Sequence, residues 1–296
     1  MNPPARPILT FTGNLLAEHT LEFDTWSPGR TQRARTTSFQ VGGKGINVAR
    51  MLSRLSVPNT ALCFAGGATG AECEAWLAAR DVPHRVFRTS AATRSGTVVR
   101  TADGSTDPRP ETTFLGPDVP PDAAAVQACA EFLDAQPAGG VLAVCGSIPG
   151  WADASFAPLR AAFSSWAHRG VLAVDTYGPA LADLVALEPD LVKINAQELA
   201  GLPEPLRPGR ATGATRWIVT DGPGPVRVRD AAGERMFQPP PVNEVSPTGS
   251  GDVLLACVLT ALHARGATLD QAVAFALPFA AANAAHPGVA EFPDPR

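Results

Sequence analysis

The sequence predicts an α/β fold in which helices cover both faces of a mostly parallel sheet. Three observations predict it: short apolar runs alternate with Ala- and Leu-rich stretches, no internal repeat is visible, and 45% of the 296 residues are hydrophobic. Such alternation is typical of parallel sheets sandwiched by helices, and this apolar content can fill a large core. We expect residues 1–296 to form a single domain.

The elements follow from the local pattern. Strands are expected where short runs are apolar or β-branched, at 8–12, 61–65, 141–145, 171–175, 191–194 and 217–220. Helices are expected where longer stretches are rich in Ala, Leu and Arg, at 46–55, 72–80, 122–135, 156–168, 253–265 and 269–285. The Pro- and Gly-rich stretch 201–215 has no apolar period and is expected to be a loop.

Two half-polar stretches, 21–40 and 94–115, interrupt this rhythm. In both, Thr, Arg and Ser alternate with single apolar residues, which suits a small sheet with one exposed face. We expect them to meet as a lid over the active site, with bounds of roughly 13–40 and 94–115; a solvated surface hairpin is the alternative. Because exposed lid strands often pair between subunits, a homodimer through the lid is expected.

Composition excludes several classes of protein. The 24 Lys and Arg against 28 Asp and Glu give a net charge of −4, which argues against a nucleic-acid partner. The five cysteines are scattered and form no CxxC pair, so neither a disulfide framework nor a zinc site is indicated. Residues 1–7 lack a signal-peptide pattern and no apolar run reaches the length of a membrane span, so a cytoplasmic location is expected.

The strongest motif is the run SPTGSGD that ends at Asp252, directly before an apolar helix. Gly249, Ser250 and Gly251 at a helix start can point backbone N–H groups at an anion, with the helix dipole in support. Asp252 would then lie in the first turn, where it could accept a proton from a hydroxyl that attacks a phosphate. An ordinary N-terminal helix charge is the alternative for Asp252.

A second glycine cluster, VGGKGIN, also precedes a helix. It has neither Walker nor dinucleotide-binding spacing. Gly43 allows close backbone approach, while Lys44 and Asn47 can donate hydrogen bonds to an oxygen-rich ligand. A plain helix-capping turn is the alternative.

A third candidate, Lys193, Asn195 and Glu198, lies where a buried strand gives way to a helix. Ligands of open α/β sheets bind at this end of the strands. Asn195 and Glu198 are three residues apart and share a helical face, but the same spacing is also an ordinary capping box.

Taken in order, these motifs resemble the ribokinase-like (PfkB) carbohydrate kinases, most closely the branch of 1-phosphofructokinase and tagatose-6-phosphate kinase. The resemblance spans almost the whole chain and is carried by GGKGINVARML at 42–52, CGSIPG at 145–150, VDTYGPAL at 174–181, VKINAQEL at 192–199 and SPTGSGD at 246–252. It implies a three-layer α/β/α sandwich with a small β-sheet lid, and ATP and Mg²⁺ as cofactors. Dependence on a monovalent cation is left open.

The resemblance also implies roles for single residues. Asp252 would be the catalytic base, and the amides of Gly249, Ser250 and Gly251 would form the anion hole. Asn195 and Glu198 would organise Mg²⁺ and the phosphates, Glu198 indirectly through water. The remaining nucleotide contacts would come from Lys193, Thr220, Gly222 and Asn283, and the substrate contacts from Gly43, Lys44, Asn47 and Arg94.

The chain departs from the family pattern at several substrate positions. Glu18 stands where this branch has an Asp that holds sugar hydroxyls, and Val98 stands where it usually has a phosphate-binding Lys, although Arg100 is near. The stretch TTFLGPD at 112–118 alters a further polar contact. On the nucleotide side, the 201–215 loop is short and Pro225 replaces a glycine.

Three functions remain open on the sequence. Lys44 and Arg94 favour a kinase for a sugar phosphate, whereas Glu18 and Val98 favour a kinase for an unphosphorylated sugar, polyol or nucleoside. A sugar- or nucleotide-binding regulator without turnover is the third, and the retained Asp252 with its glycines speaks against it. A dinucleotide-dependent dehydrogenase is disfavoured because the first βα turn carries no glycine fingerprint.

Overall fold

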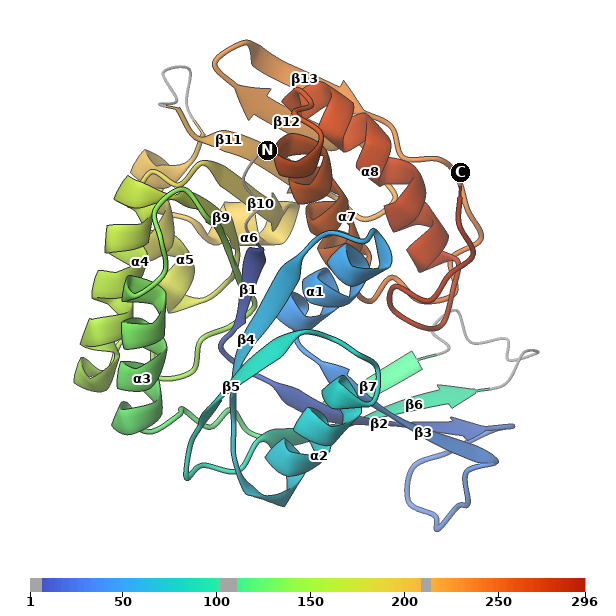
Figure 1. Cartoon of the computed structure of the whole chain (residues 1–296). Coiled ribbons are helices and arrows are strands. Elements are labelled where there is room, and N and C mark those ends of the chain that lie inside the picture. The colour runs from blue at the N-terminus through green and yellow to red at the C-terminus, as the bar shows by residue number, and fades with distance from the viewer. Residues whose placement is uncertain (1–6, 102–110, 209–213, 296) are drawn as a thin grey trace.

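A nine-stranded sheet forms the centre of the protein in the computed structural model, which describes residues 7–101, 111–208 and 214–295 (Figure 1). Its strand order is β13-β12-β11-β10-β9-β8-β1-β4-β5. The strands are β1 Ile8–Thr12, β4 Asn59–Ala65, β5 His84–Arg88, β8 Val141–Cys145, β9 Val171–Asp175, β10 Leu191–Asn195, β11 Arg216–Thr220, β12 Val226–Asp230 and β13 Gly233–Phe237. Strands β5 to β11 in this order are parallel, and β12 and β13 add an antiparallel edge.

Helices cover both faces of this sheet (Figure 1). One face carries α3 Ala123–Asp134, α4 Ala157–Arg169, α5 Pro179–Val185 and α6 Ala196–Gly201. The other carries α1 Lys44–Arg54, α2 Gly67–Ala78, α7 Ser250–Leu259 and α8 Leu269–Ala284. The predicted three-layer α/β/α sandwich is therefore confirmed.

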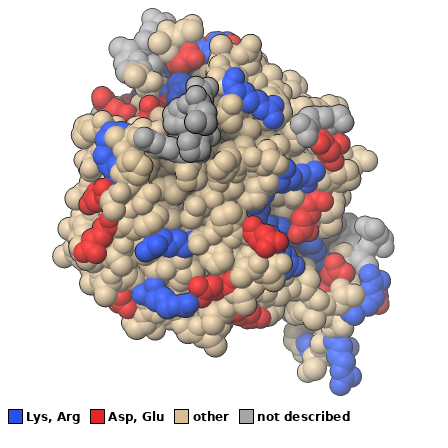
Figure 2. All heavy atoms as spheres, viewed as in Figure 1, with Lys and Arg blue, Asp and Glu red and all other residues tan. Residues whose placement is uncertain are grey.

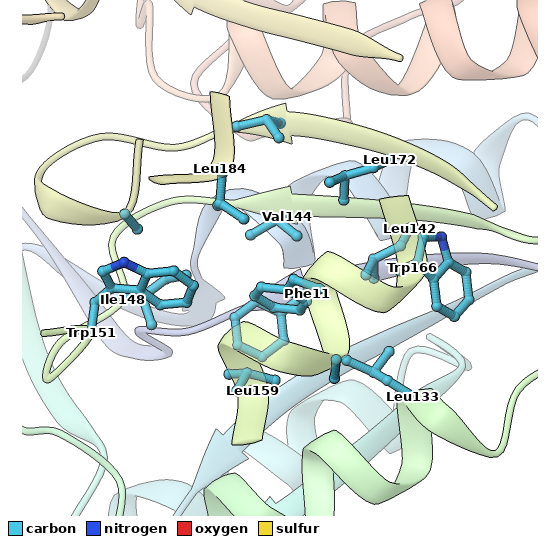
Figure 3. Close-up of a cluster of buried hydrophobic side chains, with 14 of the residues drawn as sticks. Phe11, Leu133, Leu142, Val144, Ile148, Trp151, Leu159, Trp166, Leu172 and Leu184 are labelled. Atoms are coloured by element: carbon cyan, nitrogen blue, oxygen red, sulfur yellow. The ribbon is translucent and has the colours of Figure 1, made fainter. Parts of the chain in front are cut away.

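Strand alternation divides the core into two layers. In β1, Leu9 and Phe11 belong to the cluster against α3 and α4, which Figure 3 shows packed around Phe11, whereas Ile8 belongs to the cluster against α1, α7 and α8. Because every second side chain of a strand points to the same face, a buried parallel strand must be apolar on both sides. This requirement explains why the central strands read as continuous apolar runs.

A second sheet of four strands, in the order β3-β2-β6-β7, joins the two half-polar stretches. Its strands are β2 Leu16–Phe23, β3 Thr36–Gly42, β6 Arg94–Thr101 and β7 Glu111–Leu115, with β2 and β6 parallel and the outer pairs antiparallel. Figure 1 shows this four-stranded sheet beside α2, at one end of the central sheet. The two stretches thus meet in one sheet, as the sequence predicts.

Several element bounds differ from the sequence prediction. Helices α1 and α2 start earlier, at Lys44 and Gly67, because glycine-rich first turns read as loops in the sequence. The expected helix 253–265 is α7 followed by a π-helical turn at Thr260–Ala264. Within the expected loop at 201–215 there is a short 3₁₀ turn, Glu204–Leu206.

The strands β5, β12 and β13 were not predicted. Their sequences, HRVFR, VRVRD and GERMF, carry several charged residues because they lie toward the edges of the sheet, where one face meets water. Residues 102–110 of the expected lid and 209–213 of the expected loop lie outside the described residues, as do 1–6 and 296.

Two further features concern the helices and the surface. In the described part of the chain, the helices are too short or too polar to cross a membrane. Figure 2 shows positive and negative side chains interspersed on the visible face, with no large area of one sign.

Candidate active site

A cavity of about 470 Å³, called the main cavity because Asp252 lines it, lies between the central sheet and the four-stranded sheet. Thr12, Cys145 and Asn195, at the carboxyl ends of central strands, form part of one wall. The other wall is one face of the four-stranded sheet, whose cavity-lining residues include Leu16, Glu18, Gln40, Gly42, Val98, Arg100, Glu111, Thr113 and Leu115. The cavity thus occupies the position where open α/β sheets bind ligands.

Asp252 lies in the first turn of α7 and lines this cavity, although it is only 5% exposed. Its Oδ2 accepts a hydrogen bond of 2.8 Å from Asn47 Nδ2. Burial, together with repulsion from the carboxylate of Asp175, raises the pKa of Asp252 to about 6, against the opposing effects of Lys193, Lys44 and Asn47. A carboxylate with a pKa near neutrality is suited to act as a general base.

The glycine-rich turn before α7 brings backbone close to the cavity. Gly249 has a left-handed conformation (φ 76°), and a Cβ there would lie 2.5 Å from Val289. Gly249 and Gly251 line the main cavity, while Ser250 lines a neighbouring one and its N–H donates to the carbonyl of Pro247 at 3.2 Å. At the start of α7 the cavity is therefore lined by the backbone of these glycines, as an anion-binding helix terminus requires.

Two lysines converge on a buried carboxylate beside Asp252. Lys44 Nζ lies 2.9 Å from Asp175 Oδ1 and 3.2 Å from Glu198 Oε1, and Lys193 Nζ lies 2.6 Å from Asp175 Oδ2. Burial lowers the pKa of Lys44, but Asp175, Asp252 and Glu198 together raise it above its usual value. Burial raises the pKa of Asp175, but the two lysines outweigh this effect, so its pKa lies below the usual value.

Asp175 is a residue that the sequence reasoning missed. It is fully buried at the end of β9, one strand away from Lys193 on β10. The sequence could have indicated it, since in VDTYGPAL an acidic residue ends a buried apolar strand, where ligands of open α/β sheets bind. Tyr177 of the same motif was also missed; it lines the cavity, and its ring centre is 5.3 Å from Lys44 Nζ.

Asn195 and Glu198 form the capping box that was the alternative interpretation of this motif. Glu198 N–H donates to Asn195 Oδ1, and Asn195 N–H donates to Glu198 Oε2, each at 2.8 Å. Asn195 also lines the main cavity. The described residues contain no group of three or more His, Cys, Asp or Glu that could hold a metal ion, so a divalent ion near Glu198 would take most of its ligands from phosphate oxygens and water.

A second cavity of about 770 Å³ adjoins the first, and Thr220 and Gly251 line both. Gly222 lines only the second cavity. The wall of the second cavity is largely apolar and includes Val226, Leu254, Leu277, Ala280 and the prolines 239–241. Such a wall can accept the flat face of a nucleotide base while the phosphates extend toward Gly251.

Asn283 supports the glycine-rich turn from beneath. Its side chain is fully buried and does not line either cavity. Nδ2 donates to the carbonyl of Thr248 at 2.9 Å and to Ser250 Oγ at 3.1 Å, while Oδ1 accepts from Ala290 N–H at 2.9 Å. Its expected role as a nucleotide contact stays a prediction.

The expected substrate residues all face the main cavity. Gly43 adopts φ 127°, and a Cβ there would lie 2.6 Å from Thr12 Cγ2, so only glycine allows this approach. Glu18 accepts a hydrogen bond from Gln40, and burial raises its pKa. Arg94 donates to Asp118 Oδ1 at 2.8 Å, a contact that the sequence did not predict.

The replacement of the expected lysine by Val98 leaves Arg100 as the next cation on this wall. Val98 and Arg100 are two residues apart in β6 and line the same cavity. Arg100 Nε is 2.9 Å from Glu111 Oε2, and Nη2 donates to the carbonyl of Pro287 at 2.9 Å. Arg100 can therefore substitute for the lysine in position, but it already has a carboxylate partner.

Comparison with known proteins adds independent findings. Residues 14–295 match the family described as pfkB family carbohydrate kinase. The 1-phosphofructokinase of Rhodobacter capsulatus is 30% identical over 280 residues, which cover 90% of this chain and 85% of that protein. The ATP-dependent 6-phosphofructokinase isozyme 2 of Escherichia coli (strain K12) is 29% identical over 257 residues, which cover 82% of this chain and 81% of that protein.

Solved structures agree with this assignment. The crystal structure of phosphofructokinase-2 from Escherichia coli in complex with substrates and products is similar with a TM-score of 0.84 and 25% identity, over 97% of this chain and 95% of that one. A ribokinase from Thermotoga maritima gives a TM-score of 0.71 at 18% identity, over 97% of this chain and 96% of that one. The ribokinase-like fold predicted from the sequence is thereby confirmed.

Proposed function

The chain belongs to the pfkB family of carbohydrate kinases, and from this premise we propose that it transfers the γ-phosphoryl group of ATP to a hydroxyl of a sugar phosphate, with Asp252 as the base. One observation carries the role of Asp252. It is a buried carboxylate with a pKa raised to about 6, and it follows Gly251, the backbone that lines both cavities. A hydroxyl in the main cavity and a phosphate at Gly251 would both be within its reach.

The chain's own residues supply most of what the transfer needs. Asn47 donates to Asp252 Oδ2 and so leaves Oδ1 for the acceptor hydroxyl, whose proton Asp252 would take. The amides of Gly249 and Gly251 would hold negative charge that develops on the transferred group. Lys44 and Lys193, both ion-paired with Asp175, would offset that charge further.

The nucleotide would occupy the second cavity, with its phosphates toward Gly251 and contacts from Thr220 and Gly222. A divalent ion, proposed as Mg²⁺, would be held through water by Glu198 and would neutralise phosphate charge. The related phosphofructokinase-2 of Escherichia coli has a crystal structure in complex with potassium, which supports a monovalent cation as a further cofactor.

The acceptor is proposed to be a sugar phosphate because the relatives are named 1-phosphofructokinase and 6-phosphofructokinase, and because Lys44 and Arg94 line the main cavity. A second candidate is an unphosphorylated sugar, polyol or nucleoside. It is favoured by the ion pairs of Arg94 with Asp118 and of Arg100 with Glu111, which already neutralise both arginines.

We also propose that the four-stranded sheet acts as a lid and as the contact of a homodimer. Its inner face lines the main cavity, and Phe114 on its edge strand β7 is 54% exposed and does not line that cavity. A cytoplasmic location is proposed because the five cysteines are scattered along the sequence without a CxxC pair, a usage typical of reducing compartments.

The experiment that tests the kinase is ADP release from Mg²⁺·ATP across fructose 1-phosphate, fructose 6-phosphate, tagatose 6-phosphate, free sugars and nucleosides. We expect acceptor-dependent ADP, and we expect Asp252→Asn to lower kcat by about 10²- to 10⁴-fold. ADP release that is equal in the parent and in Asp252→Asn would refute the base. The absence of ADP release with every acceptor of the panel would count against the kinase reaction.

The control for this variant is its stability. Folding raises the pKa of Asp252, so the proton stabilises the fold at low pH and this contribution is lost as the pH rises through about 6. The neutral amide of Asn does not carry the cost of the buried charge. The melting temperature of Asp252→Asn at mildly alkaline pH should therefore not be lower than that of the parent.

A further inference from the structure

The loop that follows β7 places a carboxylate on an arginine of the acceptor wall. Asp118 Oδ1 accepts a hydrogen bond of 2.8 Å from Arg94 Nη1 and another of 2.8 Å from Asn14 Nδ2. Asn14 is buried in the turn between β1 and β2 and donates in addition to Ser147 Oγ at 2.9 Å. Asp118 is thus held by two donors, one of them cationic.

Arg94 is arranged to bind more than this one carboxylate. Its side chain is only 12% exposed, and it lines the main cavity. Its Nε is buried and has no hydrogen-bond partner among the described residues. A buried donor without a partner is costly, so a ligand oxygen that reached it would be stabilised.

Asp118 is the more exposed partner of this pair. Its side chain is 52% exposed and lies on a loop, whereas Arg94 begins a strand inside the four-stranded sheet. Because the half-exposed carboxylate can regain water when it leaves Arg94, breaking this pair costs less than breaking a fully buried pair. An anion that entered the cavity could therefore replace Asp118 on Arg94.

No other cation of this wall is free to receive an anion, within the residues that the structure describes. Arg100 is paired with Glu111, and Glu18 adds a further carboxyl group to the same face. Like charges placed side by side weaken binding, so a phosphate at Arg94 has to displace Asp118 or share the guanidinium with it.

We propose that Asp118 determines acceptor specificity by competing with the phosphate of a phosphorylated acceptor for Arg94. The inference rests on the proposed function, because it concerns the acceptor half of the same site. A phosphomonoester dianion competes with Asp118 for Arg94, and a neutral sugar hydroxyl does not. Asp118 thereby reduces the preference of the enzyme for phosphorylated over unphosphorylated acceptors.

The test is calorimetric binding of fructose 6-phosphate, fructose 1-phosphate and fructose, without ATP, to the parent and to Asp118→Asn. Asn keeps the size of the side chain and an oxygen that accepts from Arg94 and Asn14, but it has no charge. We expect at least one of the two sugar phosphates to bind about tenfold more tightly to Asp118→Asn, with the affinity for fructose unchanged. Asp134→Asn, an exposed site on α3, controls for the change in net charge.

A double variant decides whether the gain passes through Arg94. In Arg94→Gln/Asp118→Asn the tighter binding of the sugar phosphate should disappear, because the cation for which Asp118 competes is gone. The proposal is overturned if neither sugar phosphate binds Asp118→Asn more tightly, if fructose gains equally, or if the gain survives in the double variant. Because these measurements need no turnover, a gain in binding without any ADP release would refute the kinase reaction and leave the role of Asp118 standing.

Discussion

Asp252 is a charged side chain that the fold keeps where charge is costly. It is buried beside Asp175, and Asn47 is the one side chain that donates a hydrogen bond to it in the described structure. The motif around Asp252 could be predicted from sequence because glycines at a helix start are a local signal. The partner of Arg94 could not be predicted from sequence, because Asp118 is 24 residues away in the chain and meets Arg94 only in the folded protein.

The raised pKa of Asp252 predicts the pH dependence of the enzyme. The base works unprotonated, so kcat/KM should rise with pH up to about 6 and level off above it, falling about tenfold per pH unit on the acidic side. Asn47 lowers the pKa of Asp252 through its hydrogen bond, so Asn47→Ala should move this acidic limb to higher pH.

The measurement is the pH profile of kcat/KM for the acceptor that the ADP assay identifies. Asn59→Ala, which removes another buried amide that bonds to Ser53 and Val57, should leave the limb in place. A limb near pH 4 in the parent, or one that Asn47→Ala leaves unmoved, would contradict the assignment of the base.

At the scale of elements, the helix starts at glycine-rich turns were the least predictable bounds. Glycine disfavours a helix in isolation, yet α1 and α2 both begin within glycine-rich turns. Glycine is needed in these turns because the backbone comes close to Thr12 and to residues 89–93, which leaves no room for larger side chains. Likewise, the edge strands escaped prediction because charge on one face hides the apolar period. Local sequence therefore predicted the centres of the elements better than their ends.

The turn before α7 gives a prediction at this scale. Gly249→Ala should cost more stability than Gly266→Ala, although both glycines have positive φ. The left-handed backbone costs roughly 1 kcal/mol at either site. At Gly249 the new methyl group also meets Val289, which adds about 1–3 kcal/mol, whereas nothing lies within 4 Å of a Cβ at Gly266.

Urea unfolding of the two variants measures this difference. Adding Val289→Ala to Gly249→Ala should recover part of the loss, because the smaller side chain gives the new methyl group room. Equal losses at the two glycines would show that the packing of the C-terminal segment against this turn is loose.

At the scale of the whole molecule, sequence predicted the layers but not the order of the strands. Alternating apolar runs indicate a sandwich, whereas pairings such as β2 with β6 join segments far apart in the chain. The place of the four-stranded sheet relative to the cavity depends on those pairings. Its assembly from two half-polar stretches was predicted from their similar character alone.

The exposed edge of this sheet predicts the state of association. We expect a dimer in sedimentation velocity at micromolar concentration, and a monomer for Phe114→Glu, because a charge in an apolar contact cannot be buried without cost. Met236→Glu is the matched control, since Met236 is 61% exposed on β13, an edge strand of the other sheet. A monomeric parent, or equal loss of the dimer in both variants, would refute the contact.

The position of β1 has a consequence for how the chain is made. It lies inside the central sheet between β4 and β8, and Ile8 is opposite Val141. During synthesis, one edge of this strand therefore has no partner until almost half the chain has left the ribosome. An apolar strand with an unpaired edge associates readily with other chains. Nascent chains that end before β8 should therefore depend more on chaperones than longer nascent chains do.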